Sequence, residues 1–84
     1  MDVSSTHSLE VLLQRVEVLE RLVEGPSYRR DLSDELGVSR STIDRAVREL
    51  EELQFVENCR DGVRATAAGR NAIDHLANFQ DRTR

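Results

Sequence analysis

The 84-residue chain is long enough for one small domain that can fold alone. Its single cysteine excludes an intrachain disulfide and a cysteine-based zinc site, and its two histidines lack the spacing of metal ligands. The formal net charge of −4 argues against simple phosphate binding, and the chain has neither a bilayer-length apolar run nor a signal peptide, so we expect a cytoplasmic protein.

The first expected helix covers residues 8–24, which contain no glycine or proline and are rich in leucine and valine. One apolar stripe at helical spacing is wide enough to cover a small core, and it consists of Leu9, Leu12, Leu13, Val16, Leu19 and Val23. A second, nearly opposite stripe of Val11, Val18 and Leu22 needs another cover. We expect that cover from a neighbouring subunit, from the C-terminal helix or from a further domain.

Residues 27–36 are expected to form a second, short helix. Ser27 can cap its start, because the hydroxyl can accept a hydrogen bond from a free amide of the first turn. Tyr28, Leu32 and Leu36 recur every four residues and would therefore face a core. The glycine that follows can adopt the left-handed conformation that ends a helix sharply.

A third helix is expected at residues 39–53, with Ser39 as its cap. Its apolar stripe consists of Ile43, Ala46, Val47, Leu50 and Leu53. Its opposite face carries arginines, hydroxyls and one carboxylate, which can reach base edges and phosphates; these residues are Arg40, Ser41, Thr42, Asp44, Arg45 and Arg48. A short helix, a glycine turn and a longer helix with such a face are typical of the motif that sets a recognition helix into the DNA major groove. The alternative is an ordinary solvated helix with oppositely charged residues four apart.

A hairpin is expected at residues 55–66, because Asp-Gly between two short extended runs is a strong hairpin signal. A three-residue loop with its glycine left-handed would pair Cys59 with Val63. The inner face would then hold Cys59, Val63 and Ala65. Asn58 and Arg64 would point outward.

The last expected helix covers residues 66–80, with Thr66 as its cap. Its apolar residues form a narrow stripe of Ala72, Ile73, Leu76 and Phe79. That stripe can pack on the first helix or across a two-fold axis.

A hairpin directly after a helix-turn-helix makes a winged helix, and the sequence resembles the winged helix-turn-helix regulators of the MarR and ArsR type. The resemblance covers about residues 9–79 and rests on the run 31–50, on Phe55-Val-Glu and on Ala65-Thr-Ala-Ala-Gly-Arg70. The last segment looks like the Leu-Thr-x-x-Gly-Arg signature that follows the wing in these families, with alanine in place of the leucine. The resemblance implies a mainly helical domain with a small β-hairpin, in the order of three helices, two strands and a fourth helix.

The resemblance also implies which residues bind DNA. The base-reading candidates are Arg40, Ser41, Thr42, Asp44, Arg45 and Arg48. Ser27, Arg29 and Arg30 would lie near the DNA backbone. Arg60 and Arg64 on the hairpin would touch phosphates or enter a minor groove, or would simply be solvated.

Regulators of this kind usually dimerise through their terminal helices. The resemblance therefore implies a homodimer with an interface made by Val11, Val18, Leu22, Leu76 and Phe79. Packing within a single chain is the alternative.

All 12 basic residues are arginine, and 16 residues are acidic. Lysine-free, acid-rich chains resemble the proteins of salt-loving archaea. In molar salt, counterion release contributes little to DNA affinity, so recognition would depend on base contacts and DNA shape. The chain also resembles the N-terminal DNA-binding domain of longer archaeal regulators, which carry a sensor domain beyond it.

Two functions remain in competition. The first is a dimeric, sequence-specific transcriptional regulator that binds a palindromic duplex site. The second is a winged-helix module for protein–protein contact in a transcription or assembly factor, which the acidic charge favours; burial of Arg45 and Arg48 in ion pairs would strengthen it. We expect neither catalysis nor a cofactor, since the sequence has no Ser-His, Cys-His or metal constellation and no glycine-rich phosphate loop.

Overall fold

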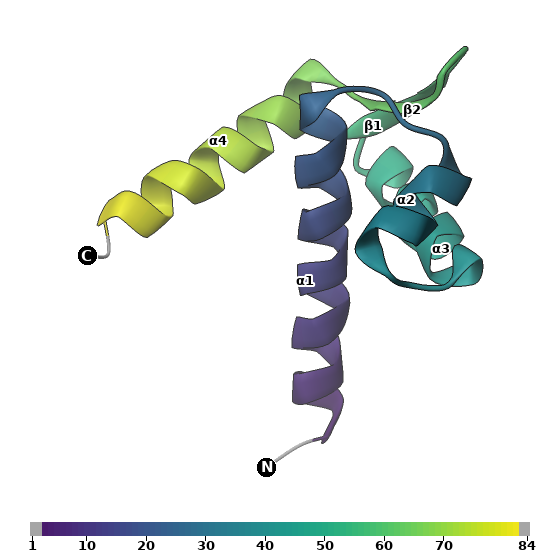
Figure 1. Cartoon of the computed structure of the whole chain (residues 1–84). Coiled ribbons are helices and arrows are strands. Elements are labelled where there is room, and N and C mark those ends of the chain that lie inside the picture. The colour runs from purple at the N-terminus through teal and green to yellow at the C-terminus, as the bar shows by residue number, and fades with distance from the viewer. Residues whose placement is uncertain (1–2, 83–84) are drawn as a thin grey trace.

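The computed structural model describes the backbone of residues 3–82 and the side chains of residues 12–76. In that range four helices and a two-stranded antiparallel hairpin occur in the order α1 (Val3–Glu24), α2 (Arg29–Leu36), α3 (Arg40–Glu52), β1 (Val56–Cys59), β2 (Gly62–Ala65) and α4 (Ala67–Arg82). The expected mainly helical domain with a small hairpin is therefore confirmed. Helices α2 and α3 and the hairpin gather on one side of the C-terminal half of α1, and α4 leaves on the other side (Figure 1).

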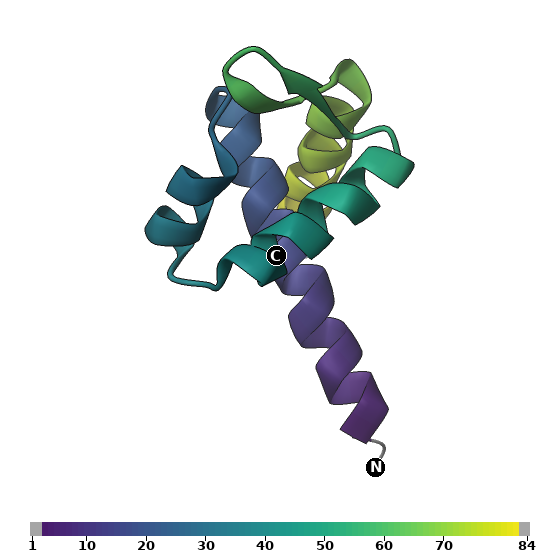
Figure 2. The same cartoon turned by 90° about the vertical axis from the view of Figure 1, so that its right-hand side faces the viewer.

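The core lies where α1, α3 and the hairpin meet. It is made of buried apolar side chains, namely Val18, Leu19, Leu22, Leu32, Ile43, Ala46, Val47, Leu50, Val56, Val63 and Ala65. Each large side chain among them contributes about 1.5–3 kcal/mol on burial. The N-terminal part of α1 extends beyond this core and away from the other elements (Figure 2).

The assignment of the two α1 stripes was right only in part. Leu19 of the first stripe is buried and Val23 packs against the core, as expected, but other members of both stripes lie elsewhere. Val18 and Leu22, expected to be covered by a neighbouring subunit, the C-terminal helix or a further domain, are 2% and 1% exposed in the chain's own core. Leu12 and Leu13, expected in the core, are 56% and 61% exposed. Both stripes are apolar, so helical spacing alone could not choose between them. The choice follows from the packing of α3 and the hairpin against α1, whose N-terminal part extends beyond them (Figure 2).

The start of α2 also differs from the prediction. Tyr28 is the N-cap residue, without a side-chain cap hydrogen bond, and it is half-exposed instead of facing the core. Ser27 is buried and extended, and its backbone pairs with Val63 through hydrogen bonds of 3.0 Å and 2.9 Å. The residue expected as a helix cap thus adds a third, one-residue strand beside the hairpin.

The other helix ends follow the local sequence as expected. Gly37 adopts a left-handed φ of 68° and ends α2. The Ser39 hydroxyl accepts from the Thr42 amide at 3.2 Å and caps α3. The Thr66 hydroxyl accepts from the Gly69 amide at 3.2 Å at the start of α4. These caps satisfy amides that a helix start leaves without partners.

The hairpin register is one residue away from the prediction. Cys59 pairs with Gly62 and Asn58 pairs with Val63, so the loop has two residues instead of three. A one-residue shift turns each side chain to the other face of the sheet. Asn58, not Cys59, therefore shares the face of Val63, while Arg64 is exposed as expected. Val63 pairs with Asn58 on one side and with Ser27 on the other, and the two pairings are compatible.

Candidate nucleic-acid interface

The exposed face of α3 is the first part of the candidate site. Four apolar residues of this helix are buried, which turns the polar face outward. Arg45 and Arg48 are exposed and have no hydrogen bond or ion pair with any residue whose side chain is described. The burial in ion pairs that would favour a protein-contact role is therefore not observed for these two arginines.

The hydroxyls at the start of α3 point back to the cap. The Ser39 hydroxyl lies 3.2 Å from that of Ser41 and 2.8 Å from that of Thr42. Ser41 is nevertheless exposed, and Thr42 is half-buried. Both are close enough to the surface to exchange a hydroxyl partner for a ligand.

Asp44 has a position that the sequence did not indicate. Its Oδ1 accepts from Arg29 of α2 at 3.5 Å and lies 3.8 Å from Arg40 one turn earlier on α3. The pair with Arg40 has the four-residue spacing of an ordinary solvated helix, whereas no local spacing indicates the contact with Arg29. Asp44 thus contacts arginines of two helices.

Arg29 continues this contact toward the hairpin. It donates to Asn58 Oδ1 at 3.2 Å, and the Asn58 amide nitrogen donates to Glu51 Oε2 of α3 at 2.7 Å. The network joins α2, α3 and β1, although each exposed pair is worth only about 0–1 kcal/mol. Sequence reasoning missed Asn58 and Glu51, because no local spacing links them to Arg29.

A basic hollow of about 340 Å³ lies between the starts of α2 and α3 and the hairpin. We define it by its lining residues, which are Tyr28, Arg29, Arg30, Arg40, Asn58, Gly62 and Val63. Arg30 is exposed and has no partner among the described side chains. Three of the predicted DNA-binding arginines therefore meet at one place.

The remaining predicted DNA contacts have different surroundings. Arg60 is exposed in the hairpin loop and has no ion pair with a described residue. Arg64 donates to Glu57 Oε2 directly across the hairpin at 2.7 Å, which offsets its charge. Ser27 is buried, and its hydroxyl donates to the Tyr28 carbonyl at 3.3 Å, so the side chain is not on the surface where a backbone contact was expected.

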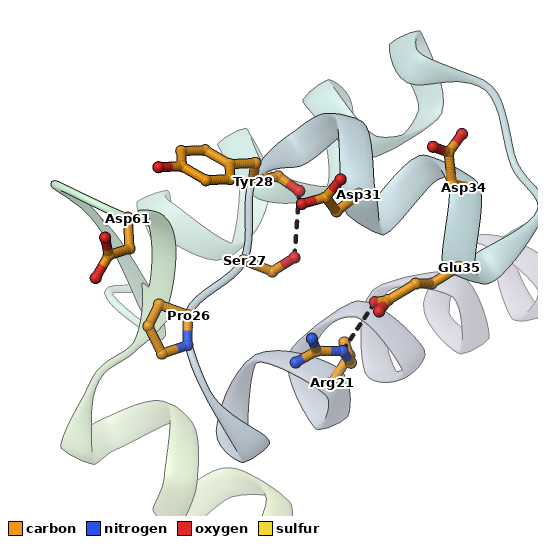
Figure 3. A pocket seen from close by; sticks show the side chains of 8 residues that line it. All are labelled: Arg21, Pro26, Ser27, Tyr28, Asp31, Asp34, Glu35 and Asp61. Atoms are coloured by element: carbon orange, nitrogen blue, oxygen red, sulfur yellow. Dashed lines mark hydrogen bonds and ion pairs between the residues drawn. The ribbon is translucent and has the colours of Figure 1, made fainter.

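An acidic hollow of about 480 Å³ is also lined by Tyr28 (Figure 3). Asp31, Asp34 and Glu35 of α2 line it together with Asp61 of the hairpin loop. Arg21 reaches in from α1 and donates to Glu35 Oε1 at 2.8 Å. Among the residues described, no group of three or more metal-ligating side chains could hold a metal ion. The domain thus separates its charges around Tyr28.

The predicted dimer contacts divide into three cases. Val18 and Leu22 are core residues of a single chain and are therefore not available to a partner. Leu76 on α4 is 42% exposed. The side chains of Val11 and Phe79 lie outside the described residues.

Four helices with a hairpin between the third and the fourth are consistent with a winged-helix arrangement. The family model described as HVO_A0261 N-terminal domain matches residues 4–84, so the chain belongs to that family. A comparison with curated proteins gave no match. Within the described part of the chain, none of the helices has the length and apolar character needed to cross a membrane.

Proposed function

We propose that this chain is a winged helix-turn-helix domain that binds double-stranded DNA in a sequence-specific manner as part of a cytoplasmic transcriptional regulator. The observation that carries the proposal is the exposed face of α3, where Arg45 and Arg48 have no partner among the described side chains. Helix α3 would enter the major groove, and the hairpin with Arg60 would contact the backbone or the minor groove. No catalytic role and no cofactor form part of the proposal.

The arginines of α3 are suited to base recognition for a chemical reason. A guanidinium can donate two parallel hydrogen bonds to the O6 and N7 atoms of guanine. Each such contact discriminates against a wrong base by about 1–3 kcal/mol. Arg45 and Arg48 would carry this discrimination, and Ser41 and Thr42 would add hydroxyl contacts.

The net charge of −4 does not contradict DNA binding, because the charges are separated in space. The acidic hollow and the basic hollow share only Tyr28 among their lining residues, and Arg40 of α3 lines the basic one. The family is named after a gene of Haloferax volcanii, which supports our expectation of a halophilic archaeal origin. In high salt, base contacts would matter more than counterion release.

We also propose that the domain acts as a homodimer on a palindromic site. Leu12 and Leu13 on α1 and Leu76 on α4 are exposed apolar side chains that a second copy would cover. Val11 and Phe79 remain candidates for the same surface. The two α3 helices would then enter major grooves about 34 Å apart. A C-terminal sensor domain in a longer protein would contribute further contacts to this dimer.

The test is selection of duplexes from a randomised library, followed by fluorescence anisotropy at low and at molar KCl. We expect the selection to enrich a palindromic site that the chain still binds in molar KCl. Arg45→Ala or Arg48→Ala should weaken binding to that site by about 1–3 kcal/mol. Arg70→Ala is the matched control, because Arg70 is also an exposed arginine and belongs to α4, which is not part of the candidate interface. If no sequence is enriched at any salt concentration, the proposal that this domain recognises DNA is wrong.

The acidic hollow favours one second candidate, a winged-helix module for protein–protein contact in a transcription or assembly factor. Four carboxylates around an exposed tyrosine would suit a basic protein segment. Binding of a basic peptide that Asp31→Asn and Asp34→Asn abolish, without duplex enrichment, would favour this candidate over the first.

A further inference from the structure

The basic hollow is unusual for this chain because no carboxylate lines it. The chain has 16 acidic and 12 basic residues, yet the lining contains three arginines, a tyrosine and an asparagine and no aspartate or glutamate. Two carboxylates contact lining residues from outside the lining: Asp44 interacts with Arg29 and Arg40, and Glu51 accepts from Asn58. The hollow therefore concentrates positive charge and hydrogen-bond donors.

The start of α2 adds further donors at the same place. The first amides of a helix have no acceptor inside the helix, and the positive end of the helix dipole lies there. Tyr28, the N-cap residue, provides no side-chain cap, and the neighbouring Ser27 hydroxyl is turned to the Tyr28 carbonyl. These amides belong to Arg29, Arg30 and Asp31. The side chains of Arg29 and Arg30 line the basic hollow, whereas that of Asp31 lines the acidic one.

The three arginines differ in how firmly they are held. Arg29 has two partners, Asp44 and Asn58, and is fixed by them. Arg40 has only a loose contact of 3.8 Å to Asp44. Arg30 has no partner among the described side chains. Arg30 and Arg40 are thus free to turn toward an anion, while Arg29 keeps the wall of the hollow in place.

We propose that the basic hollow is a binding site for one phosphate group. Arg30 and Arg40 would donate charge-assisted, forked hydrogen bonds to its oxygens, and the first amides of α2 would donate from behind. Tyr28 would add its hydroxyl. In the free protein, Asp44 would keep the Arg40 side chain near the hollow. On phosphate binding, Arg40 would exchange its loose contact with Asp44 for the phosphate.

The same chemistry has two sources, a phosphodiester of the DNA backbone or a free phosphate or phosphorylated small molecule. The location favours the backbone, because the hollow lies between the start of α3 and the hairpin, which are the elements proposed to contact DNA. This choice of source rests on the proposed function, whereas the phosphate site itself does not. A phosphate here would fix the register of α3 on the duplex without reading sequence.

The site is tested first without DNA. Inorganic phosphate is titrated into the ¹⁵N-labelled chain at constant ionic strength, with chloride as the exchanged anion. We expect saturable shifts of the amides of Arg29, Arg30 and Gly62, and about tenfold weaker binding in Arg30→Ala from the loss of one charge-assisted contact. Arg70→Ala, which removes the same charge elsewhere, leaves the affinity unchanged. The absence of saturable shifts around the hollow, or equal weakening in both variants, overturns the proposal.

The second arm uses duplex DNA and identifies the source. If the phosphate comes from the backbone, Arg30→Ala lowers the salt slope of duplex binding by about 0.9, the value expected for one lost phosphate contact. Phosphate binding with an unchanged duplex slope supports the site but overturns the backbone as its source. If no duplex binds at all, the proposed function fails. The phosphate titration still tests whether the basic hollow binds phosphate.

Discussion

Gly62 lies directly against the backbone of Ser27: a Cβ on residue 62 would come within 2.4 Å of the Ser27 carbonyl oxygen. The two residues are 35 positions apart in the sequence, and their contact joins the segment before α2 to the hairpin. The hydrogen bonds between Ser27 and Val63 depend on this approach. This close backbone contact therefore helps to position the hairpin beside α2, together with the buried side chains of Val56, Val63 and Ala65.

We predict that Gly62→Ala destabilises the domain by about 2–4 kcal/mol, because the new methyl group meets the Ser27 backbone and φ at this residue is +109°. Urea denaturation followed by circular dichroism measures the change. Gly37→Ala is the matched control: its φ is +68° but nothing lies within 4 Å of the added Cβ, so only the left-handed penalty of about 1–2 kcal/mol applies. Equal losses in the two variants would contradict the contact.

We predict that Gly69→Ala also destabilises the domain, although alanine favours a helix by about 1 kcal/mol over glycine. Its Cβ would come within 2.2 Å of the Phe55 carbonyl oxygen and 3.1 Å of Leu19 Cδ1, so α4 must move away from the core. The sign of the change in Tm is diagnostic. Gly25→Ala, with nothing within 4 Å of its Cβ, provides the comparison without a steric clash. A higher Tm for Gly69→Ala would show that α4 does not pack as described.

We predict that Asp44→Asn makes DNA binding less selective. The carboxylate contacts Arg29 and Arg40, and its removal frees two positive charges beside the exposed face of α3. Affinity for an unrelated duplex should rise, and the salt slope should steepen by about 0.9–1.8, as for one or two added phosphate contacts. Anisotropy titrations over a range of KCl concentrations measure both quantities. If Asp44 read a base directly, the variant would instead lose affinity for the selected site alone.

We predict that Leu13→Glu and Leu76→Glu each shift the chain from dimer to monomer in analytical ultracentrifugation. Both leucines are exposed, and a buried charge at an apolar interface is costly. Leu53→Glu is the control, because Leu53 at the end of α3 is 57% exposed but lies outside the proposed dimer surface. A wild-type chain that stays monomeric at all concentrations would contradict dimerisation by this domain alone.

Much of the fold could be predicted from the sequence, because it depends on neighbours along the chain. The Ser39 and Thr66 caps each involve an amide three residues away, and Gly37 ends α2 through its own φ. The amphipathic pattern of α3 determines which face is buried, and with it the exposure of Arg45 and Arg48. Each of these features is local, so one short segment contains the information.

Only the tertiary structure decided the features that link distant segments. α1 has two apolar stripes, and the packing of the chain buries Val18 and Leu22 of one together with Leu19 of the other. The pairing of Val63 with Ser27 adds a further chain segment beside the hairpin, and it also removed Ser27 from its expected role as a cap. Asp44 contacts Arg29 across 15 positions, and the basic hollow is closed by three separate elements. Sequence periodicity fixes the faces of a single helix, but which faces meet depends on the packing of the whole chain.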